Sequence, residues 1–189
     1  KQYRRDERPR HPAIDEYARV VDYDTHFADE RDVRRALAGY AGLVSAMDEN
    51  VGKVLRALED AGLADDTAVI YTSDHGDNTG ARGLWGKSTL YEESAGVPMI
   101  VAGPGLPRGH VVDLPVSHVD CAPAILDAAG ATSLGPLSGQ SLFDIANGAT
   151  PTRPVLCEYH AIGSSSGAFM LRHGRYKYCY QVRRPPQLF

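Results

Sequence analysis

Two short apolar runs, at residues 67–72 and 97–102, most constrain the fold of this chain. Each is long enough for one strand, and unbroken apolar runs are typical of strands that are covered on both faces. Before them, apolar residues recur every three or four positions over residues 32–61, which predicts a long amphipathic helix ending near Gly62. Helix, strand, connection and strand in this order predict an α/β fold in which the two strands pair in parallel.

The outer parts of the chain are less regular. Residues 1–31 are rich in charge and proline and have no firm period, so we expect an irregular surface segment there. Residues 32–150 would then form the later part of an α/β domain, with a further helix over residues 116–130. Residues 151–189 contain several strand-like runs and predict a small, incomplete carboxyl-terminal antiparallel sheet.

Asp74 and His75 stand directly after the first apolar run. Ligands bind at the carboxyl ends of strands in α/β sheets, because the loops there leave a crevice. A carboxylate and a neutral imidazole are both good ligands for a divalent cation, and Gly76 lets the chain turn away without a side chain in the crevice. The pair is therefore a candidate metal site, although an ordinary Asp-containing turn with a surface histidine fits the same residues.

Lys87 follows in a glycine-rich stretch, beside Trp85. A capping-box pattern from Thr89 to Glu92 predicts that a short helix begins just after it. An ammonium group next to the free N–H groups of a helix start would stabilise negative charge on a tetrahedral oxyanion. A solvated loop lysine is the ordinary alternative.

The stretch as a whole closely resembles the sulfatase family of the alkaline-phosphatase-like superfamily. The residues that carry the resemblance are Ser73-Asp74-His75-Gly76-Asp77, Gly83-Leu84-Trp85-Gly86-Lys87, Tyr91-Glu92-Glu93-Ser94-Ala95 and Val97-Pro98. Agreement on both sides extends it over most of residues 33–180. Within the family, Glu158-Tyr159-His160-Ala161 and the run from Arg172 to Tyr178 look most like the choline-sulfatase and phosphonate-monoester-hydrolase branch.

The resemblance implies an alkaline-phosphatase-like mixed sheet flanked by helices, and hydrolysis of sulfate esters. It makes Asp74 and His75 two ligands of the active-site cation, and Lys87 a contact to the sulfuryl or phosphoryl oxygens. Calcium is the cation that it favours, with manganese as the alternative if the enzyme hydrolyses phosphonate or phosphate monoesters. The chain departs from the family pattern at Asn78 and Ala81, so the loop wall that faces the substrate is expected to differ.

The family's nucleophile is a formylglycine made from the Cys or Ser of an early C-x-P-x-R or S-x-P-x-R motif, and this sequence contains no such motif. Cys121-Ala122-Pro123-Ala124-Ile125 imitates its beginning, but Ile125 replaces the arginine, so we reject Cys121 as the nucleophile. The early acidic residues that complete the family's metal shell are also absent, and two ligands are too few to hold a hard cation tightly. We expect the missing amino-terminal half of the same enzyme to supply both, and the 189 residues alone to be inactive.

Four further residues are weaker candidates for substrate binding: Arg82, Trp85, His118 and His160. Arg82 would add positive charge near the pocket, unless it pairs with a neighbouring glutamate. His118 lies near a predicted helix start, where a histidine more often serves the fold than the chemistry. His160 ends its strand close to Glu158, so it would line the substrate mouth or form a cross-strand pair.

The charge and the apolar runs of the sequence limit the classes of binding partner that we expect. A formal net charge of −4 argues against a surface that binds the phosphate backbone of nucleic acids. No run is apolar for long enough to span a bilayer, and Lys1–Arg5 lacks the apolar core of a signal peptide, so we expect no membrane partner and leave the compartment open between cytoplasm and periplasm. The expected partner is a small sulfate or phosphate ester, and a homo-oligomer is left open.

Two other classes of function stay open. A phosphoglycerate-mutase-like or phosphodiesterase-like relative would keep the Asp-His pair but would carry further metal-binding histidines, which this chain does not convincingly supply. A degenerate, non-catalytic module would have no formylglycine motif upstream and only weak affinity for metal.

Overall fold

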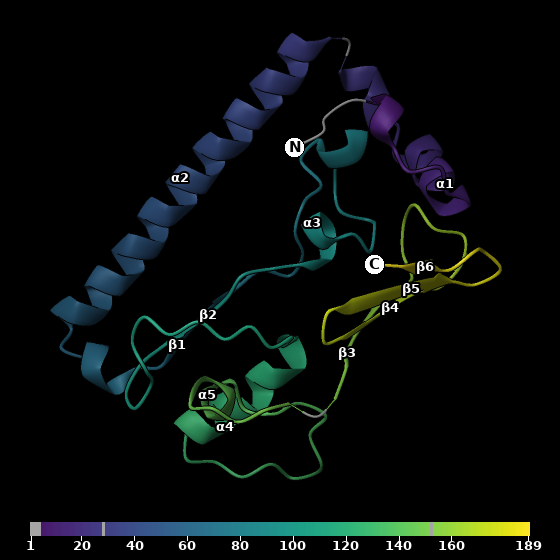
Figure 1. The fold of residues 1–189 in the computed structure, drawn as a ribbon. Coiled ribbons are helices and arrows are strands. Elements are labelled where there is room, and N and C mark those ends of the chain that lie inside the picture. Colours follow the sequence, from purple (N-terminus) through teal and green to yellow (C-terminus); the bar gives the residue numbers. More distant parts are fainter. Residues whose placement is uncertain (1–4, 28, 152) are drawn as a thin grey trace.

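The computed structural model describes residues 5–27, 29–151 and 153–189 (Figure 1). In this part of the chain the helices are α1 (Pro12–Val21), α2 (Glu30–Asp60), α3 (Glu92–Ala95), α4 (Cys121–Ala128) and α5 (Leu142–Ala146). The strands are β1 (Val69–Thr72), β2 (Met99–Ala102), β3 (Val155–Tyr159), β4 (Ala168–His173), β5 (Tyr176–Gln181) and β6 (Gln187–Leu188). Helices and strands in this order confirm the α/β class.

Strands β1 and β2 pair antiparallel, with Val69 opposite Ala102 and Thr72 opposite Met99. The prediction of a parallel pair is therefore wrong. A parallel pair needs a crossover that carries the chain back along the strand, usually on a helix. The connection here instead folds back on itself, since the Gly76 amide donates to the Ser94 carbonyl at 2.8 Å, and its helix α3 has only four residues. The chain consequently enters β2 beside the point where it left β1.

Helix α2 matches the helix predicted from the apolar period and extends along one side of the molecule (Figure 1), where Met47 lies 3.1 Å from the Tyr71 hydroxyl of β1. Its first turn is capped by Asp29, whose carboxylate accepts the amides of Arg31 and Asp32. None of its residues is buried, and Leu43 and Val54 are 71% and 63% exposed. No helix among the described residues combines the length and the apolar character needed to cross a membrane.

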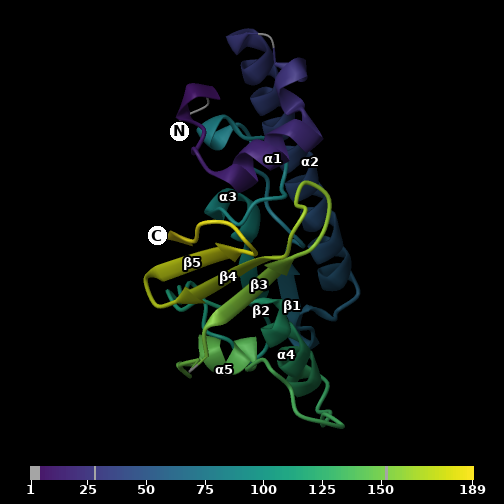
Figure 2. The ribbon, with the colours of Figure 1, turned by 90° about the vertical axis from the view of Figure 1, so that its right-hand side faces the viewer.

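The carboxyl-terminal strands form one antiparallel sheet in the order β3-β4-β5-β6. Figure 2 shows β3, β4 and β5 side by side, and Figure 1 labels β6 next to β5. The hairpin between β4 and β5 turns at Gly174, which has a φ of +53°. One face of this sheet buries Ala168, Met170 and Cys179 against Leu90, which lies in the connection between β1 and β2. The sheet is thus attached directly to the segment that carries the candidate site residues.

A second core cluster joins helix α1 to the same connection. Ile14 and Tyr17 of α1 pack with Leu84 and Tyr91, and all four are at most 5% exposed. The sequence prediction of an irregular segment over residues 1–31 missed this helix, which has a proline at its start and the His11 side chain as its cap.

Asp120 is the most deeply buried carboxylate of the described chain, at 1% exposed. Its side chain accepts the Ser117 amide and completes a capping box at the start of a 3₁₀ helix (His118–Asp120) that leads into α4. The same carboxylate accepts the Gln140 amide at 2.8 Å and pairs with Arg153. It therefore ties three distant segments together.

We expect Asp120→Asn to lower the free energy of unfolding by about 3 kcal/mol, because the Arg153 guanidinium would lose its buried countercharge. Urea denaturation of the chain measures this difference. The control is Asp127→Asn in the exposed part of α4, which should change stability little. Equal effects of the two substitutions would contradict the assigned role of Asp120.

Candidate active site

Asp74 and His75 lie in the loop that follows β1, where the sequence predicts them. The Asp74 carboxylate is largely exposed and accepts the His75 amide at 3.0 Å, whereas the His75 ring is 38% exposed. Gly76 makes this loop tight, since a Cβ there would lie 2.2 Å from the Glu93 carbonyl oxygen. The close approach of the Gly76 and Glu93 backbones brings the Asp74–His75 loop against the segment that carries Lys87.

The hydrogen bonds of His75 define its tautomer. Its Nδ1 lies 2.8 Å from the carbonyl oxygen of Gly76, which can only accept, so Nδ1 carries the proton. Nε2 is then free to use its lone pair, and it lies 2.5 Å from the Lys87 ammonium, which donates to it. The Asp74 carboxylate is 3.3 Å from the same Nε2. Asp74, His75 and Lys87 therefore converge on one point.

The loop before Lys87 is held by Asn78, which is completely buried. Its backbone and side-chain N–H groups both donate to the Gly86 carbonyl, at 2.8 and 2.7 Å. The Ser94 hydroxyl donates to the Lys87 carbonyl. Asn78 thus fixes the position of Gly86, just before Lys87. The sequence marks Asn78 only as a departure from the family pattern and does not predict this structural role.

The capping box predicted from Thr89 to Glu92 does not form. Helix α3 begins at Glu92 with Tyr91 as its N-cap, and no side chain caps it. The Thr89 hydroxyl turns instead to the Asn78 side chain, at 3.4 Å. Helix α3 thus begins later than the capping-box pattern predicts, and the role of a helix start beside Lys87 stays a prediction.

A groove of about 730 Å³ opens beside the three converging side chains. Asp74, His75 and Lys87 line one part of it, and residues 112–119 line another. Its other wall comes from β3, β4 and β5 of the carboxyl-terminal sheet, including Glu158 and Lys177. The space is sufficient for a small ester, and its walls combine apolar with charged side chains.

His118 is the only weaker candidate among the described residues that lines this groove. Its Nε2 lies 2.8 Å from the Ser73 carbonyl and 3.3 Å from the Thr72 hydroxyl. His118 therefore links the end of β1 to the 3₁₀ helix (His118–Asp120). The role in substrate binding stays a prediction, and the role in supporting the Asp74 loop is visible in the geometry.

Arg82, Trp85 and His160 lie outside the lining of the groove. Arg82 pairs with Glu93, as the alternative in the sequence analysis has it. Trp85 stacks on Phe27 with ring centroids 4.2 Å apart. His160 packs edge-on against Phe169 at 5.3 Å. The structure thus gives each of these side chains a partner away from Lys87.

Cys121 begins helix α4, and burial together with the Asp120 carboxylate raises the pKa of its thiol. A raised thiol pKa disfavours the reactive thiolate. This environment agrees with the rejection of Cys121 as a nucleophile.

Asp74 and His75 offer donors that suit a divalent cation. Asp74 offers a carboxylate oxygen and His75 an unprotonated Nε2, and their separation of 3.3 Å suits two donors that share one ion. The second nitrogen of His75 is bonded to a carbonyl, as is usual for a metal-binding histidine. Residues 5–27, 29–151 and 153–189 contain no group of three His, Cys, Asp or Glu side chains that could hold a metal ion together. The pair therefore fits part of a metal shell.

The chain is similar to known proteins over most of its length. The sequence model of the family described as Sulfatase matches residues 7–131, and that of the N-sulphoglucosamine sulphohydrolase C-terminal region matches residues 80–184. A choline-sulfatase of Rhizobium meliloti (strain 1021) is 40% identical over 172 residues, which cover 89% of this chain and 33% of that protein. Arylsulfatase K of Danio rerio is 36% identical over 189 residues, or 95% and 36% of the two chains.

Among solved structures, a phosphonate monoester hydrolase from Silicibacter pomeroyi superposes with a TM-score of 0.83 at 28% identity, covering 97% of this chain and 42% of that one. The chain belongs to the sulfatase family, within the alkaline-phosphatase-like fold. It spans about a third of the length of the curated relatives that it matches.

We expect Gly76→Ala to lower the free energy of unfolding by about 1–3 kcal/mol, because the new Cβ would force the Glu93 backbone to move. Gly39→Ala in α2 is the matched control. Nothing lies within 4 Å of its Cβ, so this substitution should stabilise the helix by up to about 1 kcal/mol. Urea denaturation of both variants measures the contrast, and a Gly76→Ala variant as stable as the original chain would exclude the close approach.

Proposed function

We propose that this chain is part of a metal-dependent hydrolase of sulfate esters. The observation that carries the proposal is the convergence of Asp74, His75 and Lys87 at the groove. A sulfate ester carries negative charge on its non-bridging oxygens, and the site offers an ammonium group together with two ligands suited to a cation. Such charge stabilisation is a large part of the rate gain in reactions of this kind.

Lys87 would bind the non-bridging oxygens of the sulfuryl group. Its ammonium now donates to His75 Nε2, and each of its remaining N–H groups can donate to an oxyanion. His75 would keep its Nδ1 proton on the Gly76 carbonyl throughout. Its single Nε2 lone pair would pass from the Lys87 N–H to the cation, which would leave that N–H for the oxyanion. A bound divalent cation, calcium or in the alternative manganese, would supply Lewis-acid charge at this point.

The remaining catalytic groups would come from outside these 189 residues. We propose that the formylglycine nucleophile and the other metal ligands belong to an upstream half of the same enzyme, since the sequence contains no formylglycine motif. The exposed apolar side chains of α2, such as Leu43, Met47 and Val54, support a large covering partner on that side. The chain would be inactive without it.

Hydrolysis of phosphonate or phosphate monoesters is the second candidate. It is supported by the structural similarity to the Silicibacter pomeroyi phosphonate monoester hydrolase. Comparing kcat/KM for 4-nitrophenyl sulfate with that for a phenylphosphonate monoester, in the enzyme that includes the upstream half, distinguishes the two. Turnover of neither compound would favour the non-catalytic alternative.

Lys87→Ala is expected to lower kcat for the preferred ester by about 10²–10³-fold, the usual cost of removing one oxyanion donor. Lys53→Ala is the matched control, because Lys53 is an exposed lysine of α2 that pairs with Glu49. A Lys87→Ala enzyme with unchanged kcat would refute the proposed function of this site.

Metal removal gives a separate test. A chelator should abolish activity and added calcium or manganese should restore it. His75→Ala should raise the metal concentration for half-maximal activity at least as much as the roughly 10–100-fold that loss of an outer-shell partner costs. His173→Ala, in the exposed hairpin turn, is the control. Full activity of the chelated enzyme would argue against a metal site at Asp74 and His75.

A further inference from the structure

Residues 5–27, here called the N-terminal segment, lie on the loop that leads to Lys87. Tyr17 is 3% exposed, and its hydroxyl donates to the Trp85 carbonyl. The Phe27 ring stacks on the Trp85 ring at an interplanar angle of 14°. Trp85 is thus held through its backbone and through its side chain, two residues before Lys87.

Arg8 adds a third contact between the N-terminal segment and this loop. Its guanidinium donates to the Gly83 carbonyl at 2.7 Å and is fixed by a bidentate pair with Asp24, at 3.0 and 2.7 Å. Arg8 holds the pKa of the Asp24 carboxyl below its ordinary value, so the pair is charged at neutral pH. A bidentate arginine of this kind has little freedom to move.

The N-terminal segment and the loop approach each other closely at Gly86. Gly86 has a φ of +72°, and a Cβ there would lie 2.8 Å from the Tyr17 hydroxyl oxygen and 2.8 Å from a ring carbon of Tyr23. On its other side the Gly86 carbonyl accepts the two bonds from Asn78. The Tyr159 hydroxyl of β3 reaches the Ser88 hydroxyl at 2.7 Å. The loop is therefore enclosed from several directions.

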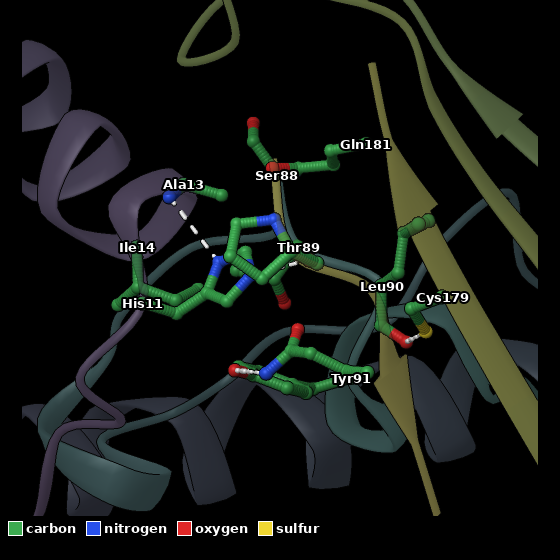
Figure 3. A pocket seen from close by; sticks show the side chains of 11 residues that line it. His11, Ala13, Ile14, Ser88, Thr89, Leu90, Tyr91, Cys179 and Gln181 are labelled. Carbon is green, nitrogen blue, oxygen red and sulfur yellow. Dashed lines mark hydrogen bonds between the residues drawn. The ribbon is translucent and has the colours of Figure 1, made fainter. Parts of the chain in front are cut away.

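The N-terminal segment is itself anchored to the carboxyl-terminal part of the chain. Glu16 pairs with Arg184 and accepts the Ser165 amide at 3.1 Å. His11 Nε2 lies 2.9 Å from the Pro185 carbonyl. Figure 3 shows this junction, where His11 and Ile14 face the chain at Ser88–Tyr91 and the strand that carries Cys179.

We propose that Tyr17 is a positioning residue for Lys87, and that the N-terminal segment sets where the Lys87 ammonium sits relative to His75. This inference rests on the proposed function of Lys87. Binding groups must be held to within about 0.5 Å of their working position by the residues around them. A displacement of about 1 Å costs about 100-fold in rate. The Tyr17 hydroxyl bonds the backbone of Trp85, two residues before Lys87, so loss of this bond would displace Lys87.

Tyr17→Phe in the enzyme that includes the upstream half tests this inference, because it removes the hydroxyl and keeps the ring. We expect kcat to fall about 10–100-fold with KM changed less than about twofold. In a Lys87→Ala background the same substitution should cause no further loss. Tyr178→Phe, on the exposed face of β5, is the matched control and should leave kcat unchanged.

The outcomes separate the two proposals. Failure of Lys87→Ala to lower kcat would refute the proposed function. If Lys87→Ala lowers kcat while Tyr17→Phe behaves like Tyr178→Phe, or if the effects of Tyr17→Phe and Lys87→Ala multiply independently, the positioning role is overturned.

Hydrogen exchange of the 189-residue chain gives a readout that needs no activity. Tyr17→Phe should speed exchange of the amides around Gly86 and Lys87, and leave those of the β4–β5 hairpin unchanged. Unchanged exchange around Lys87 would also overturn the proposal.

Discussion

The close backbone approach of Gly76 to the Glu93–Gly96 turn is the constraint on which the candidate site depends. It folds the connection between β1 and β2 back on itself, so the two halves of that connection lie together. Asp74 and His75 stand on one half and Lys87 on the other. Lys87, twelve positions after His75, thus meets the Asp74–His75 pair within hydrogen-bonding distance. The pair of strands serves mainly to fix where this connection starts and ends.

The surrounding elements maintain the geometry rather than supply the chemistry. Asp120 closes a 3₁₀ helix, and His118 of that helix contacts the Ser73 carbonyl. The carboxyl-terminal sheet contributes Tyr159 and the buried Lys177, which pairs with Glu92 of α3. Each of these contacts joins segments that are far apart in the chain. A site of a few exposed polar side chains is held in this way by buried polar ones.

Much of this could be predicted from local sequence signals. The apolar period gave α2, the runs at β1 and β2 gave their positions, and the order of Asp74, His75 and Lys87 gave the candidate site. The prediction that β1 and β2 pair in parallel was wrong, because their relative direction depends on the path of the connection between them rather than on the sequence of either strand. The prediction of a Thr89 capping box was wrong because helix α3 begins only at Glu92, with Tyr91 rather than Thr89 as its N-cap. Tyr17 left no local signal, since its partner is the distant Trp85.

Helix α2 is the longest element of the described chain and begins at Glu30. From its regular apolar pattern, Glu30 would be chosen as the first residue of a shortened protein. The core around Ile14 and Tyr17 makes that choice damaging. A chain cut there would lose the ring that covers Trp85 and would expose Leu84 and Tyr91 to solvent. The boundary for truncation is therefore set by the contacts of residues 5–27, and it lies before Arg8, whose guanidinium joins Asp24 to the Gly83 carbonyl.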